Sequence, residues 1–288
     1  GTCDTRGKGF FVVDLTNGNI IWSFTKGASS TSITSTTMKY SIPASPTITD
    51  TDGDGFIDTA YLGDLGGNMW RFTFCRNQDA STCGISSWSG GKLFDATVGT
   101  GNSKSIYTTA SVTKDKGGNI WVYWGTGNKI APTAKTGIQE YFYGVKDGRT
   151  ATYNAGHLTT LAVGATTTFD PSGGNAGFRI QLANPDVGEK VMADPTVFGG
   201  VVYFTTYTPS AGTDACNQSG DARLCGIDYT TAAGVMPDGD TFVRCEIIGS
   251  GIPSAPVISL KPSPPTATSV AASAAAAATA AGASASAA

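Results

Sequence analysis

The sequence predicts an all-β fold, a β-propeller. Helix signals are nearly absent before residue 263. Runs of β-branched and aromatic residues recur between turns rich in Gly, Asn and Asp, which is typical of short antiparallel strands. These runs also resemble one another, and repeated units of short strands indicate a propeller or another all-β array. A β-sandwich is the alternative architecture.

Four pairs of apolar runs are expected to form neighbouring strands. In the first pair the connection contains Asn17-Gly18, a strong hairpin signal because both residue types tolerate a positive φ. In the second pair the connection contains Gly66-Gly67, which allows the same kind of turn. The pairs are 9–15 with 19–24, 58–65 with 68–74, 119–127 with 140–148, and 201–208 with 224–230.

Each unit places an Asp just after an apolar strand. The first unit matches the A-x-D-x-x-T-G-x-x-x-W pattern of quinoprotein-type blades at Asp14, Gly18 and Trp22, and the second, with Asp64 and Trp70, is a shortened version. The Asp residues are Asp14, Asp64, Asp147 and Asp228, and the Trp residues assigned to the core or to blade docking are Trp22, Trp70, Trp121 and Trp124. Four units are too few to close a large propeller, so we expect a part of a larger domain.

Composition excludes two classes of protein. The chain carries 19 Lys and Arg against 22 Asp and Glu, a net charge of −3, and it has no basic stripe. A nucleic-acid-binding protein needs clustered cations to displace phosphate counterions, so this class is excluded. No run of about 18 apolar residues occurs, so no transmembrane helix is expected. We assign 1–262 to the propeller region and 263–288 to a low-complexity Ala/Ser/Thr tail or unassigned segment.

The six cysteines indicate disulfides rather than a zinc site, because no C-x-x-C pair occurs. Cys75 and Cys83 flank a polar loop, where a bridge would close about nine residues and stabilise the fold by roughly 2.5 kcal/mol. Cys216 and Cys225 flank a second polar turn, where we expect a second bridge. The pairing of the remaining two residues, Cys3 and Cys245, stays open. Disulfides persist in oxidising compartments, so a periplasmic or extracellular location is expected.

Residues 50–58 read DTDGDGFID and form the motif that carries chemistry. Acidic residues stand at relative positions 1, 3, 5 and 9, with Gly55 at position 6, where an EF-hand loop makes its sharp turn. Carboxylates spaced by two in a curled loop repel one another unless a hard cation gathers them. The sequence therefore predicts a Ca²⁺ site. Its expected ligands are Asp50, Asp52, Asp54, the backbone carbonyl of Phe56, and Asp58.

This loop is expected to be structural rather than a calmodulin-like switch. Position 12 is Tyr61 instead of the bidentate Glu of a regulatory EF-hand, and strands rather than helices flank the loop. Magnesium is a weaker candidate, because it resists an all-protein cage. The alternative is an Asp-Gly turn that binds nothing, but such a turn does not require this spacing of carboxylates.

No catalytic motif occurs in the sequence, so we predict that the protein is not an enzyme. His157 lacks a neighbouring Ser or Cys motif and is assigned to a loop, and 125–129 (GTGNK) is assigned to a blade turn. Two alternatives stay open. A periplasmic quinone-dependent dehydrogenase-like propeller would need calcium ligands and a catalytic Asp spread over several blades. A non-catalytic outer-membrane assembly scaffold would bind partners without calcium.

The motifs together resemble the C-terminal propeller of PilY/PilC-type pilus proteins, which are type IV pilus biogenesis factors and tip adhesins. The resemblance covers most of 1–250. It follows the order of the loop 50–58, TAYLGDLGGNMWRF at 59–72, WGTGNK at 124–129, EKVMADPTVFGGVVYFTTYTPS at 189–210 and RLCGIDYTTAAG at 223–234. Each piece alone would be unspecific, and their joint order is specific.

The resemblance implies a calcium-binding propeller secreted to the cell surface and placed at the pilus tip, exported through the periplasm and outer membrane. It implies calcium occupancy that regulates pilus extension against retraction, with roles in pilus assembly, surface adhesion and twitching motility. The implied partners are minor pilins, the major pilin, and a host or abiotic surface. The four Asp residues of the loop match the family's ligand positions, whereas the Arg-Gly-Asp motif of some members is absent.

Overall fold

The computed structural model describes the chain at 7–26, 32–34, 38–75, 83–96, 104–135, 137, 139–183, 188–210 and 219–260. Cys3, Cys216 and the tail 263–288 lie outside the described residues. The chain divides into two compact units, Gly1–Pro256 and Val257–Ala288. All strands of the described residues belong to the first unit.

The all-β prediction is confirmed, because the described residues form strands and two short 3-10 helices, η1 (Ile85–Ser87) and η2 (Ala155–His157). The first two sheets follow one another in the chain. The first contains β1 (Gly9–Val13), β2 (Ile20–Thr25) and β3 (Ser32–Thr34), and the second contains β4 (Thr47–Thr49), β5 (Thr59–Gly63), β6 (Met69–Thr73) and β7 (Ser89–Phe94), each in this order. In the described part of the chain, no helix is long and apolar enough to cross a membrane.

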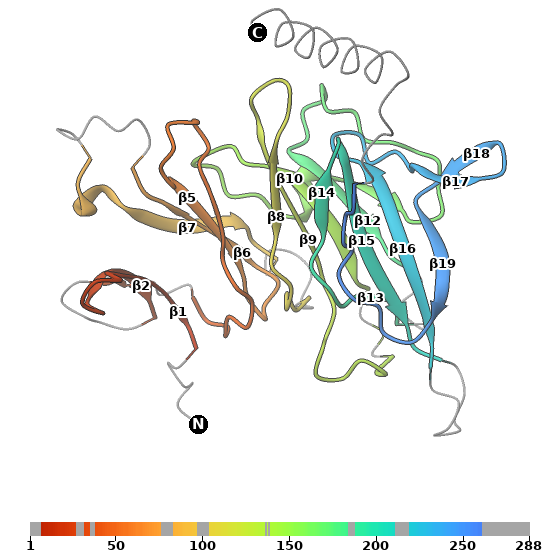
Figure 1. Ribbon diagram of the computed structural model, residues 1–288, viewed down its shortest axis with the longest axis horizontal. Helices are drawn as coiled ribbons and strands as arrows, with labels where there is room; N and C mark the ends of the chain where they lie inside the picture. Colours follow the sequence, from red (N-terminus) through yellow and green to blue (C-terminus); the bar gives the residue numbers. More distant parts are fainter. Residues whose placement is uncertain are drawn as a thin grey trace, which may run out of the picture. The chain divides into compact units, whose positions relative to one another are not determined.

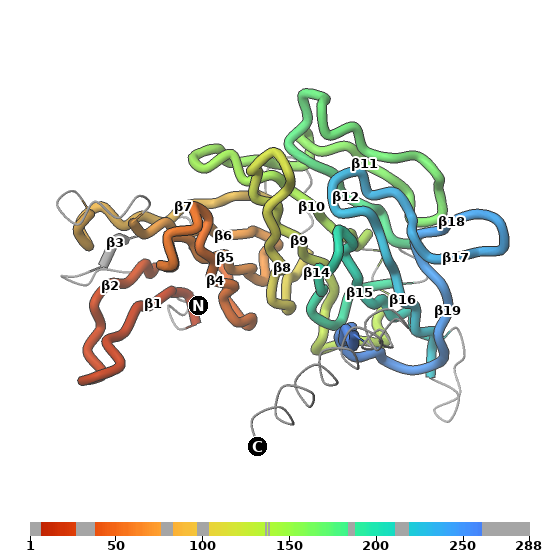
Figure 2. Tube along the Cα trace, turned by 45° about the horizontal axis from the view of Figure 1, so that its top comes forward, coloured from red at the N-terminus to blue at the C-terminus, as the bar shows by residue number. Residues whose placement is uncertain are grey.

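The third and fourth sheets have five strands each. The third contains β8 (Ser111–Lys114), β9 (Ile120–Gly125), β10 (Tyr141–Lys146), β12 (Gly177–Gln181) and β11 (Leu158–Ala162) in that order. The fourth contains β13 (Lys190–Val191), β15 (Val201–Thr208), β16 (Asp221–Asp228) and β19 (Cys245–Ser250), with β14 (Thr196–Phe198) also paired to β15. Figure 1 shows β15, β16 and β19 side by side, and in Figure 2 the hairpin of β17 (Met236–Asp238) and β18 (Thr241–Val243) extends from this sheet.

All four predicted strand pairs are present and antiparallel: β1 with β2, β5 with β6, β9 with β10, and β15 with β16. Each of the four sheets is built around an antiparallel pair, although β3 and β11 pair in parallel with β2 and β12. Consecutive small sheets of this kind are the blade arrangement of a propeller. The strand pairs lie in four different sheets, so each predicted unit corresponds to one blade.

A repeated turn closes two of these blades. Asp64 accepts hydrogen bonds from the backbone and side-chain N–H groups of Asn68 and from the indole of Trp70 at 2.8 Å. Asp115 makes the same set with Asn119 and Trp121, the indole bond measuring 2.9 Å. Both turns read D-x-G-G-N-x-W, and the second Gly has φ near +85°, a region that favours glycine. The carboxylate thus fixes the turn and the core Trp together.

Asp147 does not belong to this series, although its position after a strand suggested so. Its carboxylate accepts the hydroxyl of Tyr61 and the guanidinium of Arg71, which are cross-strand neighbours on β5 and β6. It therefore joins the second and third sheets, and it also accepts the backbone N–H of Arg149 in the turn that follows β10. Asp115 is the counterpart of Asp64 in the third blade.

The four predicted core tryptophans are all buried. Trp22 packs edge-on against Phe10 and Phe72, and Trp124 stacks on Tyr143 with ring centroids 4.9 Å apart. Such aromatic pairs add to the free energy of apolar burial. These residues therefore act as core residues rather than as a ligand platform.

Two disulfides join described residues. The structure bonds Cys75 to Cys83, the pair that the spacing favours. Cys225 pairs with Cys245, so the expected bridge to Cys216 is wrong. The reason is register, because Cys225 on β16 lies directly opposite Cys245 on β19, with Cα atoms 4.0 Å apart. Sequence separation alone does not indicate this neighbour.

We expect the turn carboxylate of Asp115 to stabilise the fold in a pH-dependent way. Burial raises its pKa, but the hydrogen bonds from Asn119 and Trp121 outweigh burial and hold the pKa below its usual value. A lowered folded-state pKa gives stability that is present above the unfolded pKa of about 4 and is lost as the pH falls through the folded value. Asp115→Asn should cost about 1–2 kcal/mol of unfolding free energy at pH 7.

Urea denaturation at pH 7 and at pH 3 measures this effect, and the difference between wild type and Asp115→Asn should shrink at the lower pH. Asp238→Asn is the control, because no described residue hydrogen-bonds to the Asp238 side chain and it is exposed. An equal loss for both variants would contradict the assigned role of the turn.

Candidate metal centre

The acidic loop 50–58 connects β4 to β5 in the second blade. Its ends are held together because Thr49 pairs with Thr59 across the two antiparallel strands. The backbone N–H of Asp58 also donates to the carbonyl of Thr49 at 3.2 Å. The sheet therefore closes the base of the loop, and the acidic residues lie above a fixed strand pair.

Three of the four predicted carboxylates converge. Asp50, Asp52 and Asp58 can each place one oxygen so that all three lie within 4.8 Å of one another. Among the residues that the structure describes, this is the single such group of three or more potential ligand side chains. Asp54 belongs to the same loop but lies outside this group.

Asp50 shapes the loop through its two carboxylate oxygens. One accepts the N–H of Gly53 at 2.6 Å and the other accepts the N–H of Gly55 at 2.8 Å. These two hydrogen bonds, the Gly53 bond first, lower the pKa of Asp50. Both glycines have φ near +90°, which residues with a Cβ rarely adopt. The prediction of a sharp turn at Gly55 is thus confirmed.

Asp52 and Asp54 continue the curl on the exposed side of the loop. Asp52 accepts the N–H of Asp54 at 3.3 Å, and Asp54 accepts the N–H of Phe56 at 2.8 Å. Each carboxylate therefore binds the backbone two residues ahead, which is an Asx turn. Hydrogen bonds within the loop are therefore sufficient to give it a curled shape without a bound cation.

Asp58 anchors the loop to the blade, since it is 1% exposed. Its carboxylate accepts the backbone N–H of Thr51 at 2.9 Å and the hydroxyls of Thr51 and Thr59. Position 12 of the loop is Tyr61, whose hydroxyl is bonded to Asp147 of the third blade at 2.6 Å. The strand that follows the loop, β5, is thus fixed by hydrogen bonds to the loop and to the third blade.

The donor set fits a hard divalent cation, because every converging side-chain atom is a carboxylate oxygen. No His or Cys joins the group, which disfavours zinc and copper. Calcium accepts six to eight oxygens in irregular arrangements, whereas magnesium demands a near-octahedral shell and retains water. A loop of carboxylates spaced by two suits calcium better.

Two weaker sequence candidates are not brought to this centre. His157 ends η2 and contacts Asn154 of the same turn, which gives it a capping role. The glycines of 125–129 are required for packing, because a Cβ at Gly125 would clash with Val191 and one at Gly127 with Lys190. Neither segment offers a catalytic or phosphate-binding arrangement.

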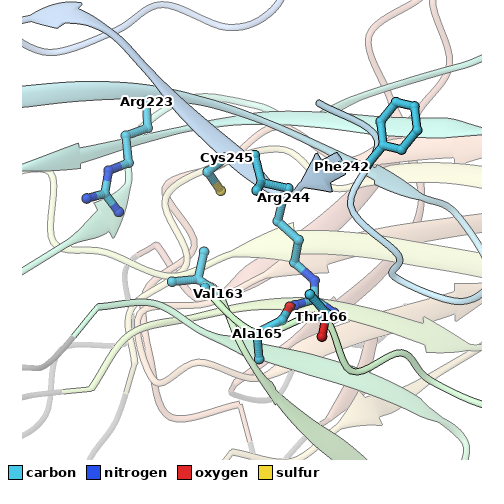
Figure 3. A pocket seen from close by; sticks show the side chains of 9 residues that line it. Val163, Ala165, Thr166, Arg223, Phe242, Arg244 and Cys245 are labelled. Atoms are coloured by element: carbon cyan, nitrogen blue, oxygen red, sulfur yellow. The ribbon is translucent and has the colours of Figure 1, made fainter. Parts of the chain in front are cut away.

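A cavity of about 150 Å³ lies beside Arg244 (Figure 3). Arg244 is 2% exposed, and its guanidinium donates to the carbonyls of Ala232, Ala162, Ala165 and Thr167. These bonds tie the strand pair β16–β19 to the segment that follows β11. Because its donors are used by backbone carbonyls, Arg244 serves as a brace rather than as a ligand-binding group.

The arrangement of this chain matches a known family. The model of the PilY1 beta-propeller domain matches residues 1–168, which is more than half of the chain. The chain belongs to the PilY1 beta-propeller domain family. The matched region includes the first two blades, the loop 50–58 and both D-x-G-G-N-x-W turns.

Relatives of this propeller domain carry the same family name. A "Type IV pilus biogenesis factor PilY1 homolog" of Xylella fastidiosa is 26% identical over 261 residues, covering 82% of this chain and 18% of its own length. The "Type IV pilus biogenesis factor PilY1" of Pseudomonas aeruginosa is 27% identical over 239 residues, covering 65% of this chain and 20% of its own length. The chain thus spans about a fifth of the length of these relatives.

A solved structure supports the fold of the PilY1-type propeller. The crystal structure of the Pseudomonas aeruginosa PilY1 C-terminal domain matches with a TM-score of 0.59 at 20% identity. The match covers 79% of this chain and 54% of that chain. At this identity the likeness concerns the fold, and together with the match to the PilY1 beta-propeller domain it confirms the propeller.

The free energy of unfolding should depend more on Asp58, which anchors the loop, than on the exposed Asp54. Asp58→Ala removes the buried acceptor that Thr51 and Thr59 share, so it should lower the unfolding free energy by about 2–4 kcal/mol. Asp54→Ala removes one exposed hydrogen bond and should cost less than about 1 kcal/mol. Urea denaturation in EDTA measures both effects without a cation. Equal losses would show that Asp58 is no anchor.

Proposed function

We propose that this chain is the calcium-binding propeller of a type IV pilus tip protein and supports pilus assembly, surface adhesion and twitching motility. The observation that carries the proposal is the convergence of Asp50, Asp52 and Asp58 in a loop that its own backbone bonds have already curled. Family membership supplies the pilus context, since the curated relatives are named type IV pilus biogenesis factors.

In this proposal the cation neutralises carboxylates that otherwise repel one another. Asp50, Asp52 and Asp58 would hold it, with Asp54 and the Phe56 carbonyl as further oxygen donors of the same loop. Calcium occupancy would regulate pilus extension against retraction by changing the charge and the rigidity of the loop 50–58 at the edge of the second blade. An extracellular site need not bind tightly, so the dissociation constant should be on the order of micromolar to millimolar.

The proposed location is the cell surface at the pilus tip, reached through the periplasm and the outer membrane. The bonded pairs Cys75–Cys83 and Cys225–Cys245 support an oxidising compartment. The proposed partners are minor pilins, the major pilin, and a host or abiotic surface. These partners belong to a whole protein of which this chain would be one domain.

Calorimetry tests the metal site directly. The wild-type chain should take up one Ca²⁺, and Asp50→Asn or Asp52→Asn should weaken binding by about tenfold or more, because each removes one negative ligand. Asp54→Ala should weaken it less, since Asp54 lies outside the converging group. Asp238→Asn, remote in sequence and exposed, is the matched control. Absence of calcium uptake by the wild type would refute the site.

A cellular assay tests the biological role separately. In a bacterium that carries the full-length protein, Asp52→Asn should reduce surface pili and twitching, whereas Asp238→Asn should leave both unchanged. Protein abundance is measured in parallel, because loss of the fold would also reduce piliation. Unchanged piliation in a strain whose protein no longer binds calcium would leave the site structural and remove its regulatory role.

The proposal assigns no catalysis to the chain. A quinone-dependent dehydrogenase is the alternative, and it requires metal ligands and a base on several blades, whereas the described candidate ligands lie in one loop. We expect no turnover of alcohols or aldehydes when pyrroloquinoline quinone and calcium are added, measured with an artificial electron acceptor. Reproducible turnover that Asp50→Asn or Asp115→Asn abolishes would overturn this expectation.

A further inference from the structure

A polar cavity of about 420 Å³ lies between the loop 50–58 and the third blade. Its volume falls in the range of several hundred Å³ that small-ligand pockets occupy. Three segments contribute its charged and polar wall: the acidic loop, the ends of the β8–β9 turn, and the turn after β10. The residues are Thr51, Asp52, Lys114, Asn119, Asp147 and Arg149.

Asp147 forms a fixed part of this wall. Its side chain is 1% exposed and accepts hydrogen bonds from Tyr61, from Arg71 and from the backbone N–H of Arg149. The carboxylate is therefore already compensated by a guanidinium and two further donors. It positions the turn that carries Arg149 and leaves the charge of the cavity to its other residues.

The two cationic side chains of the wall have donors to spare. Lys114 donates one hydrogen bond, to the carbonyl of Thr51 at 3.1 Å, and an ammonium has three donors. Arg149 has φ +65°, a left-handed conformation that is uncommon for residues other than glycine. Its N–H bond to Asp147 holds this conformation, and its guanidinium has no hydrogen-bond or ion-pair partner in the described part of the chain.

Asp52 is the carboxylate that the acidic loop contributes to the wall of this cavity. It also belongs to the converging group of the candidate metal centre. A cation held by that group would offset the charge of Asp52 and leave Lys114 and Arg149 as an uncompensated positive pair. The cavity would then attract an anion more strongly with the loop filled than with the loop empty.

We propose that this cavity binds a carboxylate of an acidic peptide segment between Lys114 and Arg149, and that filling the metal loop tightens this binding. The inference rests on the proposed calcium function and adds the chemistry of a partner. A carboxylate carries a single charge and matches the fork of an arginine. A phosphate dianion would add a second negative charge near the Asp52 carboxylate, so it is the weaker candidate.

The probe is an acetylated, amidated tri-aspartate peptide, with the tri-asparagine peptide as its neutral control. Both are titrated by calorimetry into the full 288-residue chain, once with calcium and once with EDTA. Calcium uptake is measured first, so failure of the metal site is recognised before the peptide is added. Inorganic phosphate is titrated as the competing anion.

We expect the tri-aspartate peptide to bind more tightly than the tri-asparagine peptide, and more tightly with calcium than with EDTA. Lys114→Met and Arg149→Asn should each weaken peptide binding about tenfold, because each removes a charged hydrogen bond. Asn tolerates the left-handed conformation of residue 149. Lys116→Met is the matched control, because Lys116 is exposed on the same turn but does not line the cavity.

Three results would overturn the proposal. The first is equal binding of the two peptides by a chain that has taken up calcium. The second is an equal loss in Lys116→Met, which would indicate unspecific attraction. The third is tighter binding of phosphate than of the peptide. If calcium is not taken up, the proposed metal function fails, and peptide binding in EDTA that depends on Lys114 and Arg149 would still support the cavity.

Discussion

In the second and third blades, one carboxylate accepts both backbone and indole N–H groups and so fixes a turn. Asp64 is fully buried, and burial raises its pKa, while hydrogen bonds from Asn68, Trp70 and Gly66 act in the opposite direction. An unpaired buried carboxylate would cost several kcal/mol, so these donors are required if the turn is to form. The same carboxylate binds both the turn and the core Trp, and turn geometry and core packing therefore depend on each other.

The acidic loop uses this chemistry with a different result. Asp58 behaves like Asp64, because it is buried and bonded to nearby donors. Asp50 fixes two left-handed glycines, and Asp52 remains on the exposed side. Carboxylates that stabilise the curl also have oxygens directed to a common centre. One set of residues thus both curls the loop and brings its carboxylates together.

Local patterns in the sequence predicted much of this arrangement. The features that they did not predict depend on contacts between residues far apart in the chain. The strand pairs, the burial of the tryptophans and the turn at Gly55 follow from residues close in the chain. The counterpart of Asp64 was also visible, since D-x-G-G-N-x-W recurs at 115–121, but a simple search for Asp after a strand selected Asp147. The ion pair of Asp147 with Arg71 joins residues 76 positions apart, and no local pattern specifies it.

Tyr61 gives the loop its most distinctive property. In an EF-hand the Glu at position 12 binds the cation and couples it to the departing helix. Here the hydroxyl of Tyr61 binds Asp147 of the next blade, so the departing strand is held whether or not the loop is filled. We infer that a cation would change the charge of this edge more than its shape. Regulation by calcium would then act by electrostatic attraction of a partner to the neighbouring cavity, rather than by an opening of the blade.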